Sequence, residues 1–72
     1  MKDFFNTYSN DRVVINYKGK RVCELLVLEP KSPLVQTMEN LKYAKFVCQE
    51  LEAGTFPNLK IQSMFNSIKN QN

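Results

Sequence analysis

The chain has 72 residues, of which 43% are hydrophobic and 24% are charged, and its formal net charge is +3. This length suits one small domain, and this composition is typical of globular proteins. Histidine is absent and cysteine occurs twice, so the usual metal ligands and the usual general base are missing. We therefore expect a non-catalytic protein with no metal and no cofactor.

The two cysteines, Cys23 and Cys48, lie in apolar surroundings and are interpreted as reduced core residues. The N-terminal residues Met1 to Phe5 lack the apolar stretch of about 7 to 15 residues that a signal peptide needs. No apolar run approaches the roughly 18 residues of a membrane span. We expect a cytoplasmic protein that does not enter a membrane.

Residues 1–11 form a short segment that carries three aromatic side chains, Phe4, Phe5 and Tyr8. We expect this segment to form one turn of helix with its aromatic side turned inward.

Residues 12–28 predict a β-hairpin, because they are rich in β-branched residues around the single Gly19. A three-residue loop at 17–19 is favoured over a two-residue Lys18-Gly19 loop, which would set Val13 against Glu24. The favoured register pairs Val14 with Val22, Arg12 with Glu24, and Asn16 with Lys20. It places one set of apolar residues on the inner face, namely Val13, Ile15, Cys23, Leu25 and Val27.

The other face of the hairpin carries Val14, Val22 and Leu26, and is more apolar than a face turned to water should be. We consider three candidates for the partner that covers this outer face: the N-terminal segment, a second copy of the chain, or the functional target.

Ser32 followed by Pro33 predicts a helix start, and Gly54 predicts its left-handed end, which gives a helix over about 33–53. Apolar residues at spacings of three and four predict its buried stripe, namely Leu34, Met38, Leu41, Ala44, Cys48 and Leu51, widened by Val35 and Val47. Asn58 predicts the start of a second helix over about 58–69. The fold class is α+β: one domain over 1–72 in which a hairpin packs on two helices.

The residues most suggestive of binding are Tyr17, Lys18, Lys20 and Arg21, which gather one ring and three cations at the hairpin turn. With Val14, Val22 and Leu26 as an apolar anchor, they fit a protein partner. The function predicted first is a small inhibitor or adaptor, of the kind that phages and mobile elements encode, which docks on a larger protein and occludes or bridges its working surface.

Two alternatives stay open. The same turn, together with Arg12, Lys42 and Lys45, suits a nucleic-acid-binding module in which Tyr17 stacks on a base. The outer hairpin face suits a structural subunit that self-associates as a homodimer. Charges at a turn also serve simply to keep a hairpin soluble.

Overall fold

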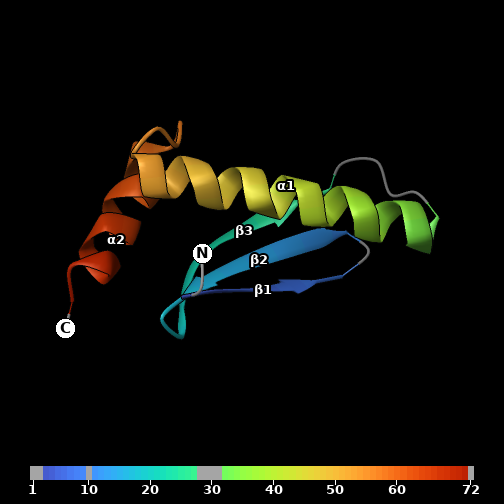
Figure 1. Ribbon diagram of the computed structural model, residues 1–72, viewed down its shortest axis with the longest axis horizontal. Helices are drawn as coiled ribbons and strands as arrows, with labels where there is room; N and C mark the ends of the chain where they lie inside the picture. Colours follow the sequence, from blue (N-terminus) through green and yellow to red (C-terminus); the bar gives the residue numbers. More distant parts are fainter. Residues whose placement is uncertain (1–2, 10, 28–31, 72) are drawn as a thin grey trace.

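The computed structural model describes residues 3–9, 11–27 and 32–71. Three strands precede two helices in the chain, in the order β1 (Phe4–Tyr8), β2 (Arg12–Tyr17), β3 (Lys20–Leu26), α1 (Pro33–Ala53) and α2 (Leu59–Lys69). The strands form one antiparallel sheet in the order β1-β2-β3. Both helices lie on one side of this sheet, as Figure 1 shows, and the predicted α+β class is confirmed.

The N-terminal segment is a strand rather than the expected turn of helix. β1 pairs with β2 along its whole length, from Phe4 opposite Tyr17 to Tyr8 opposite Val13. Aromatic residues and threonine favour the pleated conformation. β2 also pairs with the backbone groups on one side of β1, whereas a single turn of helix is unfavourable by itself. The aromatic residues therefore extend the sheet sideways instead of covering its outer face.

The hairpin register differs from the predicted one. Lys18 and Gly19 both have left-handed φ values, 51° and 78°, so the turn has two residues with Tyr17 opposite Lys20. A bulge on β3 then inserts one extra residue and shifts the remaining pairs. The observed partners are Asn16 with Arg21, Ile15 with Cys23, Val14 with Glu24, Val13 with Leu25, and Arg12 with Leu26. The bulge removes the mismatch of Val13 with Glu24 that argued against the short turn.

α1 spans Pro33–Ala53, the range that Ser32, Pro33 and Gly54 predict. Pro33 occupies the first turn, where a missing N–H costs nothing. Gly54 has φ of 78°, and its N–H returns to the carbonyl oxygens of Glu50 and Leu51, so the helix ends in a left-handed cap. α2 begins at Leu59, directly after its N-cap Asn58, whose side chain accepts a hydrogen bond from the Ile61 N–H.

The core lies between the inner face of the sheet, the second half of α1, and α2. α1 contacts β1 and β2, whereas α2 contacts β2 and β3. The buried apolar residues are Val13, Ile15, Tyr17, Val22, Cys23, Ala44, Val47, Cys48, Leu51, Phe65 and Ile68. The predicted end of the hairpin at Leu28 lies outside the described residues.

In the described part of the chain, no helix has both the length and the apolar character that crossing a bilayer requires.

Candidate interaction surfaces

The second half of α1 sets the rotation of the whole helix. Ala44, Val47, Cys48 and Leu51 are almost fully buried and face the sheet and α2. They recur at spacings of three and four, which places them on one side of a helix. Since a helix is a rigid rod over this length, the same rotation fixes which residues of the first half face inward.

The first half of α1 turns polar residues inward. Gln36 and Asn40 are each only 3% exposed. Gln36 Nε2 donates to Asn40 Oδ1 at 2.8 Å, and Asn40 Nδ2 donates to the Ser9 carbonyl oxygen at 3.3 Å. These hydrogen bonds offset the cost of removing the two amides from water.

The apolar residues of this half are nevertheless exposed, and the stripe predicted for the core is wrong there. Leu34 is 74% exposed and Met38 is 55% exposed, while Val35 and Leu41 are also exposed. We call these four residues the α1 apolar surface. Figure 1 shows that the first turns of α1 extend beyond the neighbouring ends of β1 and β2, so this part of the helix lies past the end of the sheet.

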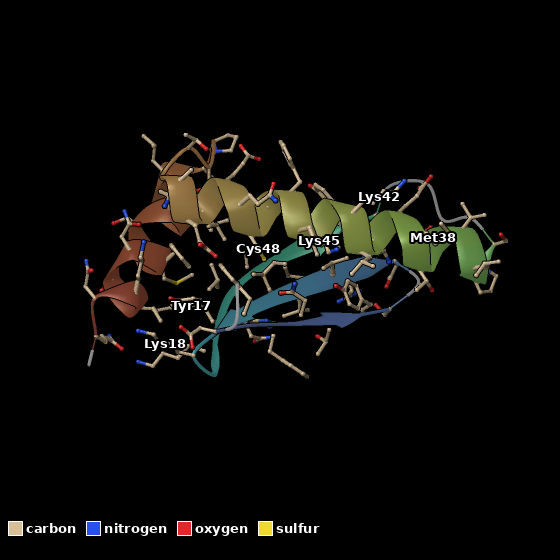
Figure 2. The ribbon with its side chains drawn as sticks, in the orientation of Figure 1. Tyr17, Lys18, Met38, Lys42, Lys45 and Cys48 are labelled. Atoms are coloured by element: carbon tan, nitrogen blue, oxygen red, sulfur yellow. The ribbon has the colours of Figure 1, made fainter. Side chains whose placement is uncertain are left out.

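Two cations lie beside the α1 apolar surface. Lys42 and Lys45 are exposed on α1, and Figure 2 shows Lys45 and Met38 on the same side of the helix. Arg12, which the nucleic-acid hypothesis groups with them, alternates with the inward Val13 and so lies on the opposite face of the sheet. The structure does not bring these three cations together.

The hairpin turn does not present a free aromatic ring. Tyr17 is 8% exposed, and its ring lies 4.8 Å from the rings of both Phe4 and Phe65. The rings of Phe4 and Phe65 are stacked at 5.6 Å. Burial also raises the pKa of the Tyr17 hydroxyl. The predicted three-residue loop that contains Tyr17 is wrong, because the two-residue turn keeps Tyr17 within β2 and on its inner face.

The two lysines of the turn contact the end of α2. Lys18 Nζ donates to the Lys69 carbonyl oxygen at 3.2 Å, and Lys20 Nζ donates to Gln71 Oε1 at 2.6 Å. Figure 2 places Lys18 below the C-terminal end of α2. Cations stabilise this end of a helix because its last carbonyl oxygens carry partial negative charge. The basic character of the turn thus has a structural role within the chain.

The remaining predicted cation of the turn, Arg21, belongs to a charged cluster on the outer face. Arg21 Nη2 lies 3.5 Å from Glu24 Oε2, and Arg12 Nη1 donates to Glu24 Oε1 at 2.6 Å. Arg12 also contacts Asp11, and this hydrogen bond holds the pKa of the Asp11 carboxyl below its usual value. The outer face is therefore crossed by a band of paired charges.

The outer face is less apolar than the sequence predicts, because the bulge turns Val22 inward, where it is buried. Val14 stays on the outer face and is half-buried, and Leu26 is exposed. The anchor predicted from Val14, Val22 and Leu26 therefore does not form one surface.

The cysteines are buried thiols. Burial raises the pKa of Cys23 to about 11 and also raises the pKa of Cys48, so both are protonated at neutral pH. Among the described residues, no three His, Cys, Asp or Glu side chains lie close enough to hold a metal ion.

Asn6 on β1 is a further feature that sequence reasoning misses. Its Nδ2 contacts Cys48 Sγ at 3.7 Å, and its buried Oδ1 finds no hydrogen-bond partner among the described residues. A buried acceptor left without a donor costs about 1–3 kcal/mol. Asn6 belongs to the edge strand β1, so this unsatisfied acceptor lies at the edge of the sheet.

Comparisons with known proteins add no relative: no family model, no curated protein and no solved structure matches this chain. Its function is therefore argued from its own residues.

Proposed function

We propose that this protein is a non-catalytic cytoplasmic binding protein that docks on a larger protein through the α1 apolar surface. The protein would act as an inhibitor or adaptor, by occluding or bridging a working surface of its partner. The observation that carries the proposal is the inverted first half of α1, where Gln36 and Asn40 are buried while Leu34 and Met38 are exposed.

The energetics support a partner at this surface. Exposed apolar side chains gain free energy when an interface removes them from water, at roughly 25 cal/mol per Å². Leu34, Met38 and Leu41 are spaced by four and three residues, which is the pattern of an amphipathic helix that docks in an apolar groove. Val35 widens the pattern on its other side.

The charges beside this surface indicate the partner's chemistry. Lys42 and Lys45 flank the apolar residues, and the whole chain is cationic, with a formal charge of +3. We infer an apolar groove with carboxylates at its rim, because such charges would steer the approach and fix the orientation of α1.

Two observations support a non-catalytic protein that binds another protein. The first concerns the thiols and argues against catalysis, and the second concerns the hairpin turn and argues against a nucleic acid. The raised pKa of Cys23 leaves little thiolate at neutral pH, and a protonated thiol is a poor nucleophile. Tyr17, Lys18 and Lys20 are engaged within the chain, which favours a protein partner over a nucleic acid bound at the turn.

The experiment is a capture of partners from a lysate of the source cells, with three forms of the protein. Met38→Glu places a charge in the α1 apolar surface, and Gln49→Glu adds the same charge at an exposed position of the same helix. One protein held in stoichiometric amount by the wild type and by Gln49→Glu, but not by Met38→Glu, is the expected result.

Nuclease and salt complete the design. Phosphate contacts make affinity fall steeply with ionic strength, whereas an apolar interface is far less sensitive. Equal capture by both variants would remove the α1 apolar surface from the proposal, and capture lost on nuclease treatment would replace the protein partner by a nucleic acid. Circular dichroism of Met38→Glu must first show an unchanged fold.

A further inference from the structure

The free edge of β1 is a second unpartnered feature, distinct from the α1 apolar surface. β1 is an edge strand, and no described segment pairs with its far side. Its sequence, Phe4–Tyr8, contains no charged residue and no proline, and its pairing with β2 is regular. Native edge strands are usually blunted by charges, prolines or bulges, and β1 has none of them.

The opposite edge of the sheet is blunted. β3 carries Lys20, Arg21 and Glu24, contains the bulge, and contacts α2. Only one edge of the described sheet is therefore suited to accept another strand.

The hydrogen bonds to β2 decide which groups of β1 point outward. The Lys18 N–H donates to the Asp3 carbonyl oxygen at 3.0 Å, and the Ser9 N–H donates to the Arg12 carbonyl oxygen at 2.9 Å. In an antiparallel pair these bonded positions alternate along the strand. The backbone groups of Phe4, Asn6 and Tyr8 therefore point away from β2, and they are centred on Asn6.

We propose that two copies of this chain pair antiparallel through their β1 edges, with Asn6 on the two-fold axis, to form one continuous six-stranded sheet. Phe4 of each copy pairs with Tyr8 of the other, and Asn6 pairs with Asn6. Those three pairs make about six backbone hydrogen bonds between the copies. This dimer goes beyond the proposed function and is carried by β1, which lies outside the α1 apolar surface.

Asn6 supports the position of the axis. Its Oδ1 lacks a donor within the described chain, and the second copy brings an identical amide, which carries both a donor and an acceptor, to the facing position. In the single chain this oxygen is buried and the amide contacts Cys48, so the proposed pairing requires the Asn6 side chain to turn toward the strand edge. The same arrangement sets the half-exposed Tyr8 beside Phe4 of the other copy, and cross-strand aromatic pairs stabilise a sheet.

The position of α1 also fits the second copy. α1 contacts both β1 and β2, so we place its axis midway between these two strands. Neighbouring strands are spaced by about 4.8 Å, and the two-fold axis lies half of this spacing beyond β1. The two-fold axis is therefore roughly 5 Å from the axis of α1. The two α1 helices would then lie about 10 Å apart, which is a normal packing distance for helices.

The residues that would line this helix contact carry complementary charge. Cys48 contacts Asn6, so the side of α1 that bears Cys48 lies over β1, and Figure 2 shows Lys45 on this side. In an antiparallel pair centred near Cys48, Lys45 of one copy lies opposite Glu52 of the other. Leu34 and Met38 lie 14 and 10 residues before Cys48, toward the other end of α1.

The experiment measures the oligomeric state and the register separately. Sedimentation over a concentration series should show a monomer–dimer equilibrium for the wild-type chain. Asn6→Pro removes an outward N–H together with the side-chain amide that contacts Cys48, and leaves the backbone ladder to β2 intact. It should therefore raise the dimer dissociation constant at least about tenfold. Thermal unfolding at low concentration checks that the Asn6→Pro monomer is folded.

Disulfide trapping tests the register without weakening the edge. In a Cys48→Ala background, Asn6→Cys places two thiols on the axis, where paired Cα atoms lie about 5.5 Å apart, within the range of a disulfide. Thr7→Cys in the same background is the matched control, because its Cα atoms lie about 7–8 Å apart across the axis. Mild oxidation should trap the first variant as a dimer and leave the second as a monomer.

The outcomes decide the proposal. A dimer that Asn6→Pro weakens and that Asn6→Cys traps supports it. A monomer at all concentrations overturns it, and so does a dimer that traps equally through Thr7→Cys or ignores Asn6→Pro, because such a dimer uses another face. Loss of partner capture by Met38→Glu bears on the proposed function alone.

Discussion

The two halves of α1 belong to one continuous helix, but one half buries apolar side chains and the other buries polar ones. The second half buries Val47 and Leu51 against the sheet and α2. The first half buries the amides of Gln36 and Asn40 and exposes Leu34 and Met38. Nothing in the helix itself separates the halves, since its caps lie only at its two ends.

The difference shows that the helix is oriented by the better-packed half. Burying a large apolar side chain is worth about 1.5–3 kcal/mol, and several such residues act together in the second half. Rotating the helix to bury Leu34 and Met38 would withdraw those residues from the core. The packing of the second half therefore sets the rotation of the first half. Hydrogen bonds of the buried amides offset the cost of removing them from water.

The largest expected effect compares one leucine from each half. Leu51→Ala should lower the free energy of unfolding by about 2–5 kcal/mol, because it removes a fully buried side chain and leaves a cavity. Leu34→Ala should change it by no more than about 0.5 kcal/mol. Urea unfolding of both variants measures the contrast, and equal losses would show that the two halves are packed alike.

An intermediate effect is expected from the inward amides. Asn40→Ala removes the hydrogen bond to the Ser9 carbonyl oxygen and the acceptor of Gln36 Nε2, so the free energy of unfolding should fall by about 1–3 kcal/mol. Gln49→Ala, at an exposed position of the same helix, is the control and should be neutral. A neutral Asn40→Ala would mean that water satisfies these amides as well as the protein does.

A further effect concerns pH and the buried thiol of Cys23 on β3. The pKa of Cys23 is raised to about 11 in the folded chain, whereas an unfolded cysteine titrates near about 8.5. The unfolded state therefore loses its proton first, so stability is fully present below about pH 8.5 and declines as the pH rises toward 11. Urea unfolding at pH 7, 9 and 10.5 should show this decline, and Cys23→Ala should show less of it. An identical pH profile for Cys23→Ala would assign the decline to other groups.

The local elements were predictable from the sequence because their signals are local. Ser32, Pro33 and Gly54 predicted the bounds of α1, and Asn58 predicted the start of α2 through its side-chain oxygen. The β-branched run around Gly19 predicted the hairpin. Each of these signals acts on backbone groups within a few residues of itself.

The register and the site were harder because they depend on distant parts of the chain. The hydrophobic pattern of β3 does not reveal the bulge at Val22. The bulge nevertheless moves the β3 residues before it, Lys20 and Arg21, to the face opposite the one predicted. The exposure of Leu34 and Met38 depends on where α2 and the sheet hold the other end of α1. The strand propensity of Phe4–Tyr8 was the one available signal for β1.

The cluster of Phe4, Tyr17 and Phe65 has a consequence for how the chain is made. Synthesis delivers the sheet first, but the ring that covers Phe4 and Tyr17 belongs to α2, 48 residues after Tyr17 in the sequence. The inner aromatic rings of the newly made hairpin therefore stay uncovered until α2 has been synthesised. Contacts between residues so far apart in the sequence form more slowly than local contacts, and until they form the aromatic, uncharged edge strand β1 is exposed to pairing with wrong partners.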